Sequence, residues 1–386
     1  MPEETRPRTG ELNAADVPLA AAAESLLGIT GQATPPAATG AGGDIAATAT
    51  AGPDDRMPAE WAPHAGTWMA FPTPNATFGD GAGLAAARAA WAAVANTIVR
   101  YEPVTMLINP GERTELLDPR ISIVEVPLDD AWLRDSGPTF VHTATGGIRA
   151  VDWTFNGWGA QPWATWDADR HLARRIARLA GVPHVSSPLT QEGGGFHVDG
   201  AGTVLLTETV QRDPDRNPGW SRERVEAEIH ARLGTSTAIW LPRGLAADYG
   251  MFGTRGHVDI VAAFTRPGTV VVHTQPDRGH PDHEVTREIT EILRDNRLEV
   301  IELLAPTVTE VDGELVDYSY VNHYVANGVV VVCGFDDPRD ADAVRVLRRA
   351  YPGREVVLVD ARDIFRFGGG IHCITQQQPI EETRWN

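Results

Sequence analysis

The sequence predicts an α/β fold assembled from about five similar units. Strands and helices alternate from residue 57 to the C-terminal end, which is typical of βαβ units. Five amphipathic helices occur in that stretch, and they suggest one helix for each unit. The segments GGGFHVD (193–199) and GGGIHCI (368–374) also share their glycines, an apolar residue and a histidine. This likeness favours internal repetition, with a chance match in a chain of 38 glycines as the alternative.

Eight runs rich in β-branched residues predict half-buried or buried strands. In chain order they are residues 104–109, 121–126, 203–206, 237–241, 269–273, 298–303, 328–333 and 355–359. The run GVVVVC at 328–333 is the most continuous of them, and such a run is typical of a strand buried on both faces. We therefore expect Cys333, at its end, to be a core residue.

Five segments between these runs space their apolar residues by three and four, which predicts amphipathic helices. They are residues 84–100, 167–180, 221–233, 283–294 and 340–350. Several begin with acidic residues and end with arginine, the arrangement that the helix dipole favours.

The first part of the chain differs in composition from the rest. Residues 31–53 are nearly all alanine, glycine, threonine and proline, which cannot bury enough apolar surface to offset the entropy of ordering. We expect residues 1–56 to form a disordered low-complexity tail. Residues 57–386 contain no linker of similar composition, so we expect them to form one catalytic domain.

The composition also limits the compartment and the partners. Two cysteines in 386 residues cannot form a disulfide framework, and the chain has neither an apolar run of about 18 residues nor a secretory apolar region. We therefore expect a soluble cytoplasmic protein that does not bind membranes. The formal net charge of −19 argues against binding to nucleic acid and favours a small cationic substrate.

The chain contains no lysine, so all 33 of its cationic Lys/Arg side chains are arginine. Walker-type phosphate loops, Schiff-base enzymes and the Cys/Glu/Lys amidohydrolases each need a lysine as charge or base. The sequence therefore excludes these three classes of protein.

Cys373 is the candidate nucleophile, because it follows three glycines in the segment FGGGIHCITQQQP (367–379). Glycines leave room for a substrate to approach the backbone closely, although a tight turn around an inert thiol would use them as well. A free cysteine has a pKa of about 8.5, so Cys373 needs a cation, a histidine or the charge of its substrate to become a thiolate.

Among the 12 histidines, His197, His257 and His372 lie in informative segments. His372 precedes Cys373 directly, and neighbouring residues on an extended chain point to opposite faces, so it is badly placed to contact the thiol. His257 and Asp259 are two positions apart in GHVDI. We expect them on one face of a strand, where they offer an acid/base group and an anion to one pocket.

Two further segments carry carboxylates next to turns. DDAWLRDSGP (129–138) contains Trp132 and Asp135, and QEGGG (191–195) sets Glu192 before glycines. Solvated loops are the alternative for each segment. A cysteine, a histidine and several carboxylates, with no lysine and no recognisable metal cluster, suit a guanidinium. Carboxylates accept its hydrogen bonds in pairs, and a thiolate attacks its central carbon.

Six motifs in this order resemble the agmatine deiminase family, which is related to the bacterial peptidylarginine deiminases. They are MPAEWAPHAGTWMAFP (57–72), WLRDSGP (132–138), VDWTFNGWG (151–159), EGGGFHVDGAGTVLLTE (192–208), GHVDIVAAF (256–264) and GGGIHCITQQQP (368–379). The resemblance implies the pentein fold, a five-bladed pseudo-symmetric α/β propeller with the active site at its centre. It also implies that the enzyme uses no metal and no organic cofactor.

The resemblance further implies hydrolysis of agmatine to N-carbamoylputrescine and ammonia, a step of putrescine biosynthesis, through an amidino-cysteine intermediate. Cys373 would be the nucleophile and His257 the general acid and base. Asp135 and Asp259 would hold the guanidinium, and Glu192 would orient either the guanidinium or the histidine. Trp132 would form a wall of the pocket, with plain packing as the alternative.

The chain departs from the family pattern at the end of the site that would receive the rest of the substrate. Arg255 lies where the family has acidic residues, and it would repel a distal ammonium and attract a carboxylate unless an ion pair turns it away. Gly195 and Gly370 replace an expected serine and asparagine. Deiminases of arginine, of a guanidino acid or of peptidyl arginine therefore stay open, as do an amidinotransferase and a non-catalytic guanidino-binding protein. A homodimer is compatible with the chain, although no interface can be assigned from sequence.

Overall fold

The computed structural model describes residues 55–382. All of them belong to one compact unit. The predicted tail, apart from its last two residues, lies outside the described residues. Arg56 forms an isolated antiparallel bridge with His142, so the described chain is already paired at its second residue.

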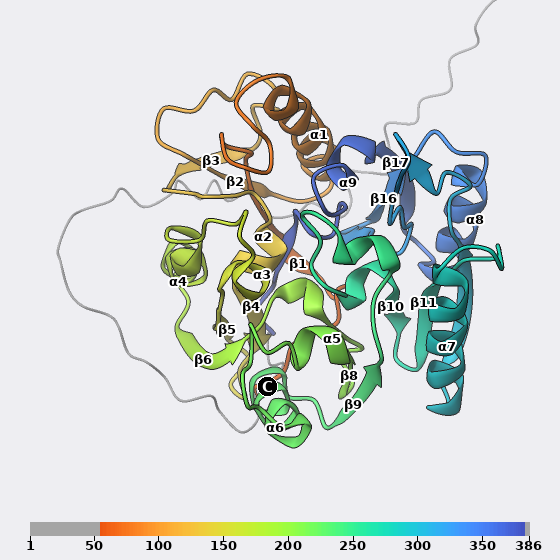
Figure 1. Cartoon of the computed structure of the whole chain (residues 1–386). Coiled ribbons are helices and arrows are strands. Elements are labelled where there is room, and N and C mark those ends of the chain that lie inside the picture. The colour runs from red at the N-terminus through yellow and green to blue at the C-terminus, as the bar shows by residue number, and fades with distance from the viewer. Residues whose placement is uncertain (1–54, 383–386) are drawn as a thin grey trace, which may run out of the picture. The chain divides into compact units, whose positions relative to one another are not determined.

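Five sheets of this unit repeat one strand order (Figure 1). In each sheet the first strand is antiparallel to the second, and the second is parallel to the third. Four of the sheets are formed by β4 (Thr139–His142), β5 (Ile148–Thr154) and β6 (His184–Thr190); β7 (Phe196–Val198), β8 (Thr203–Thr207) and β9 (Thr237–Leu241); β10 (Ala262–Arg266), β11 (Thr269–Thr274) and β12 (Glu299–Leu304); and β15 (Tyr324–Ala326), β16 (Val329–Gly334) and β17 (Glu355–Asp360).

The fifth sheet joins the two ends of the described chain. Its strand order is β18-β1-β2-β3, with β18 at Gln376–Pro379, β1 at His64–Ala70, β2 at Val104–Ile108 and β3 at Ser122–Glu125. In the antiparallel pair of β1 and β18, Trp68 lies opposite Gln376, and the Trp68 indole donates a 2.9 Å hydrogen bond to Gln378 Oε1. The last strand therefore completes the sheet that the first strand begins.

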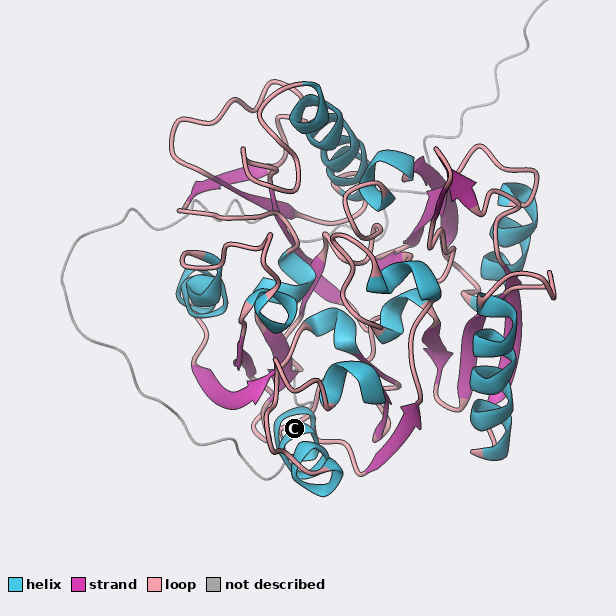
Figure 2. Ribbon diagram, viewed as in Figure 1, coloured by secondary structure: helices cyan, strands magenta, loops and turns pink. Residues whose placement is uncertain are grey.

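In each sheet a helix connects one parallel strand pair, as in βαβ units, whereas the second parallel pair of the fifth sheet, β2 and β3, is connected by turns alone. The five long helices are α1 (Ala82–Ile98), α4 (Leu172–Leu179), α6 (Arg222–Leu233), α7 (Asp282–Asp295) and α8 (Asp340–Ala350). Their buried residues recur every three or four positions; in α7 these include Val285, Ile289 and Leu293. Figure 2 shows the long helices at the periphery of the unit and short helical turns with loops in its middle.

The short elements are four single-turn α-helices, four 3₁₀ turns and one hairpin within residues 55–382. They are α2 (Leu133–Ser136), α3 (Gly157–Ala160), α5 (Glu208–Gln211), α9 (Arg362–Phe365), η1 (Asp169–His171), η2 (Gly193–Gly195), η3 (Ala246–Tyr249), η4 (Val258–Ile260) and the pair β13 (Glu310–Val311) with β14 (Glu314–Leu315). Three of them, α2, η2 and η4, contain or directly follow the candidate site residues other than Cys373 and Arg255.

All eight predicted strands and all five predicted helices are confirmed, with ends shifted by a few residues. The predicted core position of Cys333 is also confirmed, because its side chain is fully buried in β16. The likeness of the two GGG segments does not extend to local structure, since His197 lies in strand β7 and His372 lies in a turn before β18. No helix among residues 55–382 is long and apolar enough to cross a membrane.

Candidate active site

Cys373 lies in the turn that follows the glycine triplet, and its side chain is only 2% exposed. Its sulfur is 3.3 Å from Asn322 Nδ2 and 3.6 Å from Asp259 Oδ2. A Cβ atom added at Gly369 would lie 3.0 Å from this sulfur and 2.9 Å from the Trp132 ring. The middle glycine is therefore needed for the backbone to pass between the thiol and the indole.

His257 and Asp259 lie at the turn η4, not on the strand that the sequence analysis predicted. The alternating pattern was misleading because Asp248 accepts hydrogen bonds from the backbone N–H groups of Gly256 at 2.6 Å and His257 at 3.1 Å, which bends the chain. Gly256 has a φ of +112°, a conformation that favours glycine. Both side chains are nevertheless buried in the same site.

Asp135 extends from α2, and both of its carboxylate oxygens have fixed donors. The Trp158 indole donates to Oδ2 at 2.8 Å, and the Gly194 backbone N–H donates to Oδ1 at 3.0 Å. Burial raises the pKa of Asp135, the charge on His257 opposes that rise, and Asp259 adds to it. The carboxylate is thus oriented by neutral donors and surrounded by other acids.

Gly194 marks the point where three of these side chains converge. A Cβ atom at this position would lie 2.6 Å from His257 Nδ1, 2.9 Å from Asp259 Oδ2 and 3.1 Å from Asp135 Oδ1. Any side chain here would fill the space that these polar atoms share. Within residues 55–382, His257 Nδ1 and Asp259 Oδ1 are buried without a hydrogen-bond partner. Unpaired buried polar atoms are costly, and they indicate where a polar ligand would bind.

Glu192 lies behind His257 and is fully buried. Arg216 Nε donates to its two carboxylate oxygens at 3.0 and 3.1 Å, and His257 Nε2 lies 3.4 Å from Oε2. Burial would raise the pKa of Glu192, but Arg216 and His257 outweigh burial and lower it to about 2. Glu192 is therefore a permanent anion against the imidazole.

The charges of His257 and Cys373 follow from these neighbours. Burial opposes protonation of His257, but Asp135 and Glu192 raise its pKa to about 9. Burial raises the pKa of Cys373 well above its usual value, and the charges of Asp259 and Asp135 raise it further. Without a ligand, the site holds a thiol and an imidazolium, and it favours an additional cation.

Trp132 is almost fully buried, so it is both a site residue and a core residue. Its ring lies edge-on to Trp91 with the centroids 5.2 Å apart and is stacked on Phe78 at 6.4 Å. Its other side lies against Gly369, next to the thiol. Trp132 can therefore form a wall of the pocket and pack in the core at the same time.

Arg255 is held by ion pairs, which is the second of the two arrangements that its sequence position left open. Its Nη1 lies 2.9 Å from carboxylate oxygens of both Asp213 and Asp215. Asp213 also pairs with Arg216 at 2.8 Å, so Arg255 is connected to Glu192 through a chain of charges. Contact of Arg255 with a substrate stays a prediction.

The two glycines that depart from the family pattern occupy tight positions. A Cβ atom at Gly370 would collide with Asn322 Oδ1 and approach the Phe365 ring at 2.8 Å. At Gly195 it would lie 2.8 Å from Gln191 Nε2, which is the end of a flexible side chain. Here Asn322 takes the space beside the glycine triplet and contacts the thiol.

The sequence analysis missed four residues that contact either a predicted site residue or His372, the neighbour of Cys373. They are Glu60, Trp158, Arg216 and Asn322. Glu60 and Trp158 lie within the quoted motifs at 57–72 and 151–159, so those motifs contained a usable signal. Arg216 and Asn322 lie in segments without any motif that we identified.

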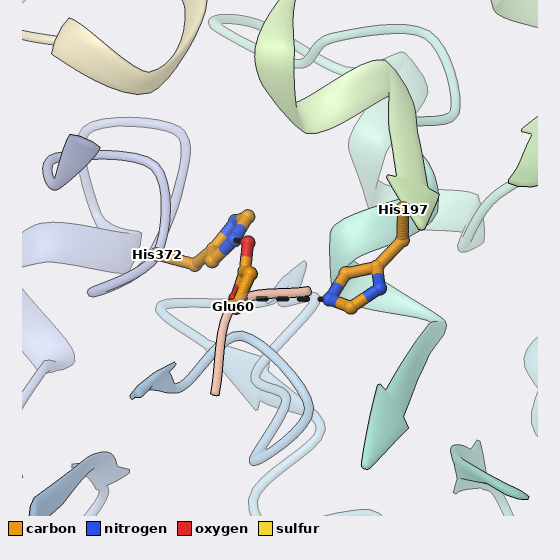
Figure 3. Close-up of side chains that lie close together, drawn as sticks. All are labelled: Glu60, His197 and His372. Carbon is orange, nitrogen blue, oxygen red and sulfur yellow. Dashed lines mark hydrogen bonds and ion pairs between the residues drawn. The ribbon is translucent and has the colours of Figure 1, made fainter. Parts of the chain in front are cut away.

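Three buried side chains form a group that the sequence analysis did not find. Ligand atoms of Glu60, His197 and His372 all lie within 4.8 Å of one another, close enough to hold a metal ion (Figure 3). They come from three distant segments, so no spacing in the sequence indicates them. That the enzyme uses no metal therefore stays a prediction.

The sequence of this chain is similar to those of known proteins. Residues 56–379 match the model of the Porphyromonas-type peptidyl-arginine deiminase family. The chain belongs to this family. A Streptomyces coelicolor protein named "Putative agmatine deiminase" is 63% identical over 334 residues, which cover 84% of this chain and 98% of the relative. A Stutzerimonas stutzeri protein named agmatine deiminase is 40% identical over 85% of this chain and 96% of its own.

Solved structures of family members have the same fold. The agmatine deiminase of Enterococcus faecalis superposes with a TM-score of 0.79 at 31% identity, covering 84% of this chain and 96% of that one. The chain therefore has the pentein type of α/β fold, built here from the five sheets and their connecting helices.

Proposed function

We propose that this protein hydrolyses agmatine to N-carbamoylputrescine and ammonia through a covalent amidino-cysteine. The observation that carries the proposal is the convergence of a thiol, an imidazole and two carboxylates around Gly194 and Gly369. Family membership and relatives named as agmatine deiminases support the same reaction.

The guanidinium is held by carboxylates on both sides of the reacting carbon. Asp135 and Asp259 accept its N–H groups, and Asp259 offers Oδ1, which has no other partner in the described part of the chain. Charge-assisted bonds of this kind are stronger than neutral ones and fix the plane of the guanidinium. Glu192 orients His257 through its contact with Nε2.

The substrate supplies the charge that Cys373 lacks. A guanidinium next to the sulfur offsets the repulsion from Asp135 and Asp259, so the pKa of the thiol falls when the substrate binds. The thiolate then adds to the central carbon and forms the C–S bond of a tetrahedral adduct. Asn322 Nδ2, 3.3 Å from the sulfur, donates toward the thiolate before this addition.

Proton transfers by His257 complete the reaction. As an imidazolium it donates a proton to one nitrogen, the C–N bond breaks, and ammonia leaves an amidino-cysteine. Neutral His257 then removes a proton from water, and the hydroxide adds to the amidino carbon. The C–S bond breaks, the departing sulfur takes up the proton of the adduct's hydroxyl group, and the ureido product is released, which restores the thiol and the imidazolium.

The proposal extends to the architecture of the catalytic domain. We infer that the five sheets of residues 57–386 surround this site as the blades of a closed five-bladed propeller. Support comes from the shared strand order and from the pairing of β18 with β1, which places the last described strand in the same sheet as the first. A homodimer stays a prediction.

Product analysis on a panel of guanidino compounds tests the function. Purified protein is incubated with agmatine, arginine, a guanidino acid and an arginine-containing peptide, and the products are measured by mass spectrometry and ammonia release. Agmatine should gain about one dalton as nitrogen is replaced by oxygen, and Cys373→Ala should abolish this gain. Conversion of arginine but not agmatine would refute the proposed substrate, and an active alanine variant would refute the covalent route.

A further inference from the structure

A chain of three buried side chains runs from the N-terminal segment to the candidate nucleophile. Glu60 Oε1 lies 2.7 Å from His372 Nε2, and His372 Nδ1 lies 2.7 Å from Asp259 Oδ2. The same Asp259 oxygen is 3.6 Å from the sulfur of Cys373. Glu60 precedes β1, His372 lies in the turn before β18, and Asp259 lies in η4, so the fold brings three distant segments together.

The geometry requires protons on both nitrogens of His372, because each nitrogen contacts a carboxylate oxygen, and carboxylates only accept hydrogen bonds. The ring is therefore an imidazolium. Burial and Arg134 oppose its protonation, but Glu60 and Asp259 raise the pKa of His372. Burial would raise the pKa of Glu60, yet the charges of His372 and Arg134 hold it well below its usual range.

The charges of this group are balanced without a metal ion. Two carboxylates, Glu60 and Asp259, are accompanied by two cations, His372 and Arg134, whose Nη1 lies 3.5 Å from Glu60 Oε1. The other titratable groups near the ring are His197, stacked on it with centroids 6.2 Å apart, and His323. A divalent ion at Glu60 would be repelled by the buried guanidinium of Arg134.

His197 differs from His372 in its hydrogen bonds. Its Nδ1 accepts the backbone N–H of Phe264 at 3.3 Å, so Nε2 carries the proton of a neutral ring and has no lone pair for a metal. This Nε2 lies 3.7 Å from Glu60 Oε2, beyond a direct hydrogen bond (Figure 3). His197 is therefore a peripheral member of the group.

We infer that Glu60 and His372 are positioning residues for the proposed deimination: Glu60 keeps His372 charged, and His372 holds Asp259 and offsets its charge beside Cys373. The inference rests on the proposed function of the site. With Oδ2 of Asp259 fixed by His372, Oδ1 is left for the guanidinium. The positive ring lowers the cost of forming a thiolate 3.6 Å from the carboxylate.

Alkylation of Cys373 by iodoacetamide tests this inference without any substrate. Only the thiolate reacts, so the rate at a fixed pH reports the pKa of the thiol. We compare the wild type with Glu60→Gln and His372→Asn at pH 8.5, and locate the label by mass spectrometry. The other thiol, Cys333, is protected because burial raises its pKa to about 12.

Both variants should be alkylated at least about tenfold more slowly than the wild type, since loss of the nearby positive charge raises the pKa of the thiol by about one unit or more. His197→Asn is the matched control, because its amide oxygen keeps an acceptor for the Phe264 N–H. It should stay within about twofold of the wild type. Equal rates in all four proteins would overturn the inference.

The metal alternative has a different outcome. If Glu60, His197 and His372 bound a cation, His197→Asn would be as damaging as His372→Asn, and the purified wild type would hold an equivalent of zinc that a chelator removes with loss of activity. Either result would overturn the positioning role. Because the alkylation of Cys373 by iodoacetamide needs no agmatine, the alkylation rates test this inference independently of the proposed substrate.

Folding of the variants is followed by circular dichroism, and a second measurement avoids substitution of the group altogether. In His257→Gln, ¹⁵N NMR with the His372 ring assigned through its own backbone should detect protons on both of its nitrogens at pH 8, since both contact carboxylates. The assignment is needed because His64 also contacts oxygen atoms through both nitrogens, Glu102 Oε1 and the Glu60 carbonyl oxygen. A His372 ring with a proton on only one nitrogen would contradict the inference, even if Glu60→Gln fails to fold.

Discussion

The indole of Trp158 donates a 2.8 Å hydrogen bond to Oδ2 of Asp135, and Trp158 holds this position with a positive φ of 56°. A large side chain in the left-handed region is unusual and must be stabilised by its surroundings. Here the ring is buried between Phe155, edge-on at 5.1 Å, and Trp163, stacked at 5.2 Å. The indole therefore orients the carboxylate that we propose as a substrate ligand.

Trp158→Phe keeps an aromatic ring and removes the donor. Hydrogen bonds to charged groups contribute about 1.5–3 kcal/mol, so we expect kcat/KM for agmatine to fall by about 10- to 100-fold. Trp163→Phe is the control, because the Trp163 Nε1 has no hydrogen-bond partner among the described residues. Steady-state kinetics should show the loss only in the first variant, and equal losses would contradict the role of the donor.

Gly194→Ala should reduce kcat/KM on the order of 100-fold, because an added methyl group must displace His257, Asp259 or Asp135. Gly147→Ala adds the same atom where the nearest neighbour, Thr143 Oγ1, is 3.6 Å away, and it should leave the activity unchanged. Wild-type kinetics in Gly194→Ala would show that the space beside this glycine is not used by the substrate.

The stability of the fold should depend on pH through His257. Its pKa in the folded protein, about 9, is above its ordinary value of 6.5, so its stabilising contribution is complete below 6.5 and is lost as the pH rises through 9. At about 1.4 kcal/mol for each pKa unit, this contribution is on the order of 3 kcal/mol. Urea unfolding at pH 6 and pH 10 should show a larger loss in the wild type than in His257→Gln. The same loss in both proteins would exclude His257 as the cause.

Arg216→Met should destabilise the fold by about 3–5 kcal/mol, because it removes the cation that pairs with two buried anions, Glu192 and Asp213. Arg212→Met is the matched control on the surface, where the pair with Glu208 is half-exposed and contributes less than about 1 kcal/mol. Chemical denaturation measures both values. Similar changes in the two variants would mean that the buried network contributes no more than an exposed ion pair.

The sequence allowed the prediction of the strands and helices whose burial is regular. Residues 328–333 and 283–294 have patterns that only one kind of element can satisfy, and the structure confirms both. The strands that were not predicted include β1, β5 and β6, whose seven residues each rule out length as the reason, and β4, β7 and β18, each only three or four residues long. Such short strands depend on their partners more than on their own composition, so a single segment gives little signal.

The candidate site also has one part that the sequence predicted and one part that it did not. Cys373, His257, Asp135, Asp259 and Glu192 lie in unusual motifs, and the structure brings them together, while their roles stay proposals. The contacts of Glu60 with His372 and of Asn322 with Cys373 join segments 312 and 51 residues apart. No local pattern predicts pairs of this kind, because the folding of the whole domain creates them.

The pairing of β18 with β1 has a consequence for how the enzyme is made. Until a ribosome has released the chain through Pro379, one edge of β1 has no neighbour, and the turn that carries Cys373 is not yet anchored. The ribosome must therefore have made β18 before the sulfur can meet its carboxylates. We therefore expect nascent fragments that lack β18 to be inactive, and a stop codon a few positions before residue 376 to remove catalysis together with the stability of the first sheet.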